Sequence, residues 1–177
     1  GKTYQTVAAS HHTPTAFATM LSGLAPTEHG VYGFSQRLPA DRPHLFALDS
    51  HTSAFSKRYL NGWLAEEQRI FGEQPREELA EMTPPFVWVN RHYGGHAPYD
   101  GFTDDGEKGE LNAKEYFLEH AGDTERLRSD YRASVDDFID DVEATIETLE
   151  AMGIREETLL VVASDHGELL GETGQIG

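Results

Sequence analysis

TLLVVASDHGE, residues 158–168, is the stretch of this sequence that decides the predicted fold. Its residues Leu159 to Ala163 are all apolar or small, and the run stops at Ser164. A run this short, rich in Val and Leu and soon followed by Gly, predicts a strand buried on both faces of a parallel sheet. Ligands of parallel sheets bind where the strands end at their carboxyl edge. Asp165 and His166 would lie at that edge, where a carboxylate beside an imidazole can bind a divalent cation or transfer protons.

The composition limits the classes of function that fit this chain. Its 177 residues are enough for one domain with a sizeable core, and we expect a single catalytic domain over residues 1–177. Lys and Arg number 14 against 31 Asp and Glu, which gives a net charge of -17. Such a surface repels nucleic acid and anionic membranes, so neither is expected as a partner. The acidic residues are spread along the chain, as in salt-adapted proteins, although a merely acidic protein fits equally well.

The sequence contains no cysteine, no membrane span and no signal-peptide pattern, which excludes further classes of protein. With no Cys, the chain has no disulfide, no thiolate nucleophile and no Cys-ligated zinc. No stretch approaches the ~20 apolar residues of a membrane span, and no signal-peptide pattern is present, which together predict a cytoplasmic location. The chain opens at Gly1 without a Met and stops at Gly177, soon after the predicted strand. We therefore expect a fragment of a longer protein.

A second predicted strand leads to a hydroxyl. YQTVAA, residues 4–9, is a plausible short strand, and a Thr-Pro pair follows it. Thr13 as N-cap and Pro14 in the first turn predict a helix that ends at Ser22-Gly23. The backbone N–H groups at its start favour an anion beside Thr13. Taken alone, a Thr-Pro pair indicates only a helix cap, and His29 further along is expected to be structural.

A third predicted strand, FVWVN at 86–90, leads to histidines. His92 and His96 follow it on either side of a Gly pair, in a loop suited to a functional site, although a histidine there can also serve packing. Two shorter segments are predicted as a strand, Thr52–Phe55, and as a helix, Glu77–Met82. These are weaker patterns than the three strands that end in reactive side chains.

A long amphipathic helix is predicted from Glu125 to Gly153, with apolar residues on one stripe and Gly153 as its terminator. It has the length of a crossover that joins 86–90 to 159–163 in a right-handed βαβ unit, so the predicted class is α/β. In one parallel sheet, Thr13, His96 and Asp165-His166 would emerge at the same edge. A cation there would lower the pKa of the hydroxyl, and His96 could protonate a leaving oxygen. The predicted chemistry is transfer of a phosphoryl or sulfuryl group from an ester to water.

At these residues the sequence resembles the sulfatase and alkaline-phosphatase superfamily. The similar segments are TPTAFATMLSGLAPTEHGV (13–31), FVWVNRHYGGHAPY (86–99) and ETLLVVASDHGELLGE (157–172), in the family's order and spacing. The resemblance implies a three-layer sandwich with a mostly parallel central sheet, of which this chain is an incomplete part. It implies Thr13 as nucleophile and metal ligand, Asp165 and His166 as metal ligands, and His96 at the leaving group.

The sequence departs from the family pattern at several positions. Thr cannot yield the formylglycine of sulfatases, Pro14 lies one residue after Thr13 instead of two, and Phe17 occupies the position of an Arg. A shifted loop would make Thr15 the nucleophile. Thr173 replaces a His, and the family's first acidic pair would precede Gly1.

These departures shape the functional expectation. Thr is the nucleophile of phosphodiesterase and phosphomutase relatives, so the resemblance implies a metal-dependent hydrolase of sulfate or phosphate esters, with phosphate favoured. The implied cation is calcium for a sulfatase, and manganese or zinc for a phosphoesterase. The implied substrate is a small-molecule or polysaccharide ester. The alternative is a catalytically inactive binding or structural module.

Overall fold

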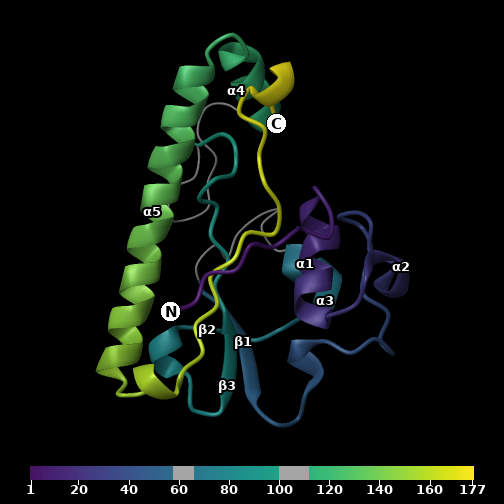
Figure 1. Cartoon of the computed structure of the whole chain (residues 1–177). Helices are drawn as coiled ribbons and strands as arrows, with labels where there is room; N and C mark the ends of the chain where they lie inside the picture. The colour runs from purple at the N-terminus through teal and green to yellow at the C-terminus, as the bar shows by residue number, and fades with distance from the viewer. Residues whose placement is uncertain (58–65, 100–111) are drawn as a thin grey trace.

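A small parallel sheet lies between one long helix and a group of shorter helices (Figure 1). This computed structural model describes residues 1–57, 66–99 and 112–177. The strands are β1 (Thr52–Ser56), β2 (Arg76–Glu77) and β3 (Phe86–Val89), in the order β2-β1-β3. Phe55 of β1 is in register with Arg76 on one side and with Val89 on the other. The predicted α/β class is therefore confirmed as a partial fold, whereas the full three-layer sandwich stays a prediction.

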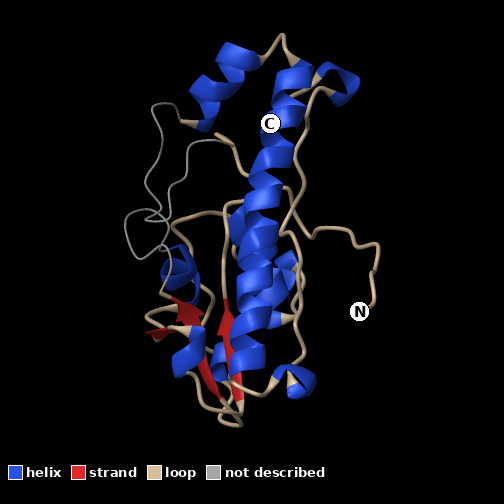
Figure 2. Cartoon of the chain, turned by 90° about the vertical axis from the view of Figure 1, so that its left-hand side faces the viewer, coloured by secondary structure: helices blue, strands red, loops and turns tan. Residues whose placement is uncertain are grey.

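Helices flank this sheet on two sides. The α-helices are α1 (Thr13–Ser22), α2 (Pro26–His29), α3 (Glu66–Phe71), α4 (Ala113–His120) and α5 (Thr124–Ala151). Single 3-10 turns are η1 (Leu45–Ala47), η3 (Leu79–Glu81), η4 (Arg155–Glu157) and η5 (Glu172–Gly174). α5 runs along the length of the molecule on one side, and α1, α2 and α3 lie on the other (Figures 1 and 2). No helix in these ranges is long and apolar enough to cross a membrane.

The ends of the two principal helices follow local signals in the sequence. α1 ends at Gly23, whose φ of 70° is in the left-handed region that glycine adopts without strain. α5 begins after Asp123, whose Oδ1 accepts a hydrogen bond of 2.9 Å from the backbone N–H of Arg126. Gly153, with φ of 72°, turns the chain away after α5. Both predicted helices are confirmed, with one difference: His12 is the N-cap of α1, and Thr13 is its first helical residue.

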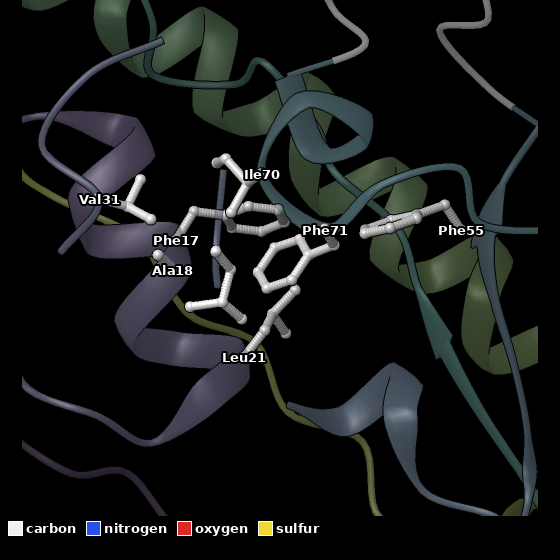
Figure 3. Close-up of a cluster of buried hydrophobic side chains, with 8 residues drawn as sticks. Phe17, Ala18, Leu21, Val31, Phe55, Ile70 and Phe71 are labelled. Atoms are coloured by element: carbon white, nitrogen blue, oxygen red, sulfur yellow. The ribbon is translucent and has the colours of Figure 1, made fainter. Parts of the chain in front are cut away.

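One cluster of buried side chains holds α1 against β1 and α3 (Figure 3). The Phe17 ring meets the Phe71 ring edge to face at 6.0 Å between centroids and lies 6.3 Å from the Phe55 ring. Leu21, one turn further along α1, is buried in the same cluster. Burial of each such side chain contributes about 1.5–3 kcal/mol to folding. This packing fixes the position of α1, which carries Thr13, relative to β1.

A second cluster of buried side chains joins the loop after β3 to α4 and α5. It contains Ala97, Tyr99, Tyr116 and Leu127, all buried. Leu170 and Ile176, from the segment that follows the Asp-His pair, pack against it as half-buried side chains. The two segments expected to carry His96 and Asp165-His166 are therefore anchored by the same apolar contacts.

The predicted strand at Leu159–Ala163 is wrong. In the described part of the chain this segment pairs with no other strand, and its Leu159 and Val161 side chains are 88% and 72% exposed. The predicted strand at Tyr4–Ala9 is wrong for the same reason, with Val7 95% exposed. A strand forms only by hydrogen bonding to a neighbour, and an apolar run does not supply that neighbour. Among the described residues, α5 therefore leads through η4 into an extended segment and closes no βαβ unit.

The predictions for the shorter segments have mixed outcomes. The strand at Thr52–Phe55 is confirmed as β1. The helix predicted over Glu77–Met82 is wrong at its start, because Arg76 and Glu77 pair with β1 as β2. The rest of that segment forms only the 3-10 turn η3.

Candidate functional site

A hydrogen bond between the side chains of Thr13 and His166 defines the candidate site. Thr13 Oγ1 lies 3.1 Å from His166 Nε2, although 153 residues separate them in sequence. Thr13 is presented by the first turn of α1, and His166 by the loop that follows the extended segment 159–163. Thr13 is 7% exposed. The structure therefore brings together two of the residues that the sequence predicted to meet.

The tautomer of His166 follows from its second hydrogen bond. Nδ1 lies 2.9 Å from the carbonyl oxygen of Gly167, which can only accept, so Nδ1 carries the proton. In the neutral imidazole Nε2 then has a lone pair, and the Thr13 hydroxyl donates to it. The hydroxyl of Thr13 is thus oriented by the ring and is not used to cap α1. This use explains why the predicted N-cap role of Thr13 is wrong.

Asp165 adds a carboxylate to this pair. Its Oδ2 lies 3.7 Å from His166 Nε2. Oxygen and nitrogen ligands of one divalent cation are separated by comparable distances, so these two atoms and the Thr13 hydroxyl have the chemistry of part of a cation site. Within residues 1–57, 66–99 and 112–177, however, no group of three His, Cys, Asp or Glu side chains converges. The described residues therefore offer only some of the ligands that a divalent cation requires.

His96 lies close enough to Asp165 for the charge of that carboxylate to affect the pKa of His96. Its Nδ1 donates to the Ala97 carbonyl at 2.6 Å, which leaves Nε2 as the acceptor of the neutral ring. Burial lowers the pKa of His96 and the positive charge of Arg91 lowers it further, against the opposing effects of the hydrogen bond to Ala97 and of Asp165. His96 is therefore neutral near pH 7 and better suited to accept a proton than to protonate a leaving oxygen.

A tyrosine and a glutamate connect the two site loops. The buried Tyr99 donates a hydrogen bond of 3.0 Å from its hydroxyl to Oε2 of Glu168. Burial raises the pKa of Glu168, while the hydrogen bond from Tyr99 partly opposes that change. Neither residue was predicted as functional. Tyr99 follows His96 and Glu168 follows His166 in the quoted segments, but their pairing requires contact across 69 residues.

α5 contacts the loop that carries His96 through hydrogen bonds and close packing. The backbone N–H of Gly95 donates to Ser134 Oγ at 2.9 Å, and Asn90 at the end of β3 donates to Asp141 at 2.5 Å. Gly94 approaches α5 closely, since a Cβ built on it would lie 2.7 Å from the carbonyl oxygen of Ser134. The contact between Asn90 and Asp141 could not be predicted from the sequence, because it depends on where the helix packs.

The remaining candidates are placed as follows. Thr15, the second candidate nucleophile, is 5% exposed, but among the described residues it is Thr13 whose hydroxyl is bonded to His166. His29 is completely buried, accepts at Nδ1 from the Val31 N–H and bonds Thr19 through Nε2. Burial lowers the pKa of His29, as expected for a structural histidine. Phe17 is a core residue.

Comparison with known proteins gives one similarity. The chain is 35% identical over 186 aligned positions to the low-salt glycan biosynthesis sulfotransferase Agl7 of Haloferax volcanii. The alignment covers all of this chain and 43% of the relative, so the chain spans less than half of the relative's length. No protein-family model and no solved structure matches the chain.

This similarity corrects the predicted reaction. A sulfotransferase passes a sulfuryl group to an acceptor other than water, so the prediction of a metal-dependent ester hydrolase, with phosphate esters favoured, is wrong. The predicted enzyme classes hydrolase, sulfatase and phosphoesterase are wrong for the same reason. What the similarity supports is the coarser statement that the chain resembles an enzyme of sulfate chemistry. The Thr13 side chain does not distinguish the two reactions, because the same nucleophile can serve either acceptor.

Proposed function

We propose that the protein transfers a sulfuryl group to a hydroxyl group of a glycan, with Thr13, His96, Asp165 and His166 at its active site. The observation that carries this proposal is the 3.1 Å hydrogen bond between Thr13 Oγ1 and His166 Nε2. The similarity to a glycan biosynthesis sulfotransferase supplies the group transferred and the class of acceptor. The quoted segments around these residues further support an active site of the sulfatase and alkaline-phosphatase type that is used for transfer.

Thr13 acts as the nucleophile in the first step. Its Oγ1 forms a bond to the sulfur of the donor while the bond from sulfur to the donor oxygen breaks, and the hydroxyl proton passes to that departing oxygen. Because His166 Nδ1–H is held by the Gly167 carbonyl, the acceptor nitrogen already faces Thr13 before the donor binds. This orientation reduces the entropy lost in reaching the reactive geometry.

His96 acts in the second step. A glycan hydroxyl oxygen forms a bond to the sulfur and the bond from sulfur to Thr13 Oγ1 breaks. His96 Nε2 takes the proton of the acceptor hydroxyl and returns it to Thr13 Oγ1, which restores the hydroxyl. The lowered pKa of His96 keeps the ring neutral and able to accept at neutral pH. Half-burial of the ring among Tyr93 and Ala97 limits the access of water that would compete as acceptor.

Asp165 and His166 are the residues of this chain that would hold a divalent cation: calcium, manganese or zinc. Bound there, the cation would supply positive charge that lowers the pKa of the Thr13 hydroxyl. The two ligand atoms lie 3.7 Å apart, which supports a shared ion, and further ligands are required to complete its coordination.

The test is a transfer assay on the full-length protein that contains this chain. Sulfur-35 label is supplied on an aryl sulfate or on an adenosine phosphosulfate, and label on a hexose-containing glycan is measured as an initial rate. Thr13→Ala should lower that rate by about a thousandfold or more, as loss of a nucleophile does. Thr13→Ser keeps the hydroxyl and should retain a measurable rate.

Thr15→Ala is the matched control, since Thr15 is a buried threonine on the same helix. It should stay within about tenfold of the wild-type rate, the range of a modest local perturbation. Full activity in Thr13→Ala together with loss in Thr15→Ala would contradict the assignment of the nucleophile. Release of label only as inorganic sulfate would contradict transfer to a glycan.

A further inference from the structure

Arg91 lies beside the candidate site and has no role in the mechanism so far. It directly follows Asn90 at the carboxyl end of β3. Its guanidinium carbon is 5.0 Å from the centre of the Tyr93 ring and 5.8 Å from the centre of the Phe17 ring. A guanidinium that lies over aromatic rings keeps its N–H donors in its own plane, where they can bond to anions.

The two rings locate Arg91 relative to the proposed catalytic groups. Phe17 follows Thr13 by four residues on α1, so both side chains lie on one face of the helix, and helical side chains lean toward the N-terminus. On its other side, Tyr93 contacts the His96 ring edge to face at 5.8 Å. Arg91 therefore lies between the face of α1 that presents Thr13 and the loop that presents His96.

The charges acting at His96 agree with this placement. Burial is the main cause that lowers the pKa of His96, and the positive charge of Arg91 lowers it further, so this charge acts on the ring. The whole chain has only 14 Lys and Arg against 31 Asp and Glu. In so acidic a protein, a guanidinium beside the site offsets the general repulsion that an anionic substrate meets at the surface.

We infer that Arg91 binds the oxygens of the sulfuryl group, a tetrahedral oxyanion, at the site formed by Thr13 and His96. This inference rests on the proposed function and adds the residue that recognises the group transferred. The planar fork of a guanidinium can donate two parallel hydrogen bonds to two oxygens of such an anion, which an ammonium cannot match. Binding at Arg91 would hold the sulfur near Thr13 Oγ1.

The experiment measures anion binding directly on the full-length protein. Inorganic sulfate, and inorganic phosphate in a second series, are titrated by calorimetry in the presence of manganese chloride. Arg91→Gln should weaken sulfate binding by about tenfold or more, the usual effect of losing a charged hydrogen-bonding partner. Arg91→Lys should bind with intermediate affinity, because it keeps the charge and loses the fork. Manganese affinity should stay within about twofold in both variants, since Arg91 is no ligand of the cation.

Arg76→Gln is the matched control. Arg76 also lies over a ring of the same cluster, at 5.7 Å from the centre of Phe55, and it donates to the Ser56 carbonyl. It should bind sulfate like the wild type. Unchanged sulfate binding in Arg91→Gln would overturn the inference, and so would an equal loss in both variants, because that loss would act through the fold.

Transfer assays separate this inference from the proposed function. If sulfate binding depends on Arg91 but no label reaches a glycan, the proposed function fails and the binding role of Arg91 stands. If label is transferred and Arg91→Gln transfers it with the wild-type KM for the donor, the inference about Arg91 fails and the proposed function stands.

Discussion

At the scale of single residues, the hydrogen bond from Tyr99 to Glu168 is a polar contact that joins the two site loops. Glu168 is a half-buried carboxylate two residues after His166, and Tyr99 lies three residues after His96. Burial raises the pKa of Glu168 because removal of water disfavours its charge. The Tyr99 hydroxyl offsets part of this cost. The pair thus stabilises the relative position of the proposed proton acceptor and the proposed cation ligands.

We predict that Tyr99→Phe will lower the free energy of unfolding by about 1–3 kcal/mol, because it leaves a half-buried carboxylate without this donor. Urea denaturation of the full-length protein measures the change. Tyr131→Phe is the control, since the Tyr131 ring packs against Tyr99 at 5.5 Å and the substitution keeps that contact. Equal stability of Tyr99→Phe and Tyr131→Phe would show that the hydrogen bond does not hold the loops.

At the scale of elements, the close approach of the loop after β3 to α5 positions His96. Gly95 donates its backbone N–H to Ser134 of α5 at 2.9 Å. A Cβ at Gly94 would lie 2.5 Å from the Cβ of Phe138 and 2.7 Å from the carbonyl oxygen of Ser134. Neither of these atoms is the end of a flexible side chain, so the loop itself would have to move. Glycine is required at residue 94 by this contact with the helix.

Gly94→Ala should therefore destabilise the protein by about 1–3 kcal/mol through overpacking. It should also lower the rate of sulfuryl transfer, because displacement of the loop moves His96 away from Thr13. Thermal unfolding and the transfer assay measure the two effects. In Gly122→Ala a Cβ meets nothing within 4 Å, so this variant should behave like the wild type. A Gly94→Ala protein with wild-type stability would contradict the described packing.

At the scale of the whole molecule, the net charge of -17 affects stability. Like charges on a folded surface repel one another, and dissolved salt screens this repulsion over a distance that falls from about 14 Å at 0.05 M to about 3 Å at 1 M. The exposed acidic face of α5 contributes to the repulsion through Asp136, Asp137 and Asp140. The folded protein should therefore gain stability as salt is added.

We predict that the Tm will rise by about 5 °C or more between about 0.05 M and 1 M potassium chloride, as expected for a gain of about 1–2 kcal/mol. Scanning calorimetry measures it. The triple variant Asp136→Asn, Asp137→Asn, Asp140→Asn removes three exposed charges and should show a smaller rise. A Tm that does not depend on salt in the wild type would disprove the electrostatic explanation.

Part of the fold and of the site could be predicted because its signals are local. α5 follows from its apolar stripe, and α1 from the Thr-Pro start and Gly23. The meeting of Thr13 with His166 also agrees with the prediction, although the route assumed for it, a shared edge of parallel strands, is not what the described residues show. The reaction could not be predicted from these residues, because water and a glycan hydroxyl can both attack the same intermediate.

By itself, the sequence determined α1 and α5, the acidic surface and the residue types available for catalysis, since each of these depends on neighbours within a few turns of chain. Tertiary structure alone decided that Leu159–Ala163 stays unpaired among the described residues, that Tyr99 bonds Glu168, and that Arg91 lies near the rings of both Phe17 and Tyr93. These features require a partner from a distant part of the chain. A one-dimensional pattern records which side chains are present, but their contacts depend on how the whole chain packs.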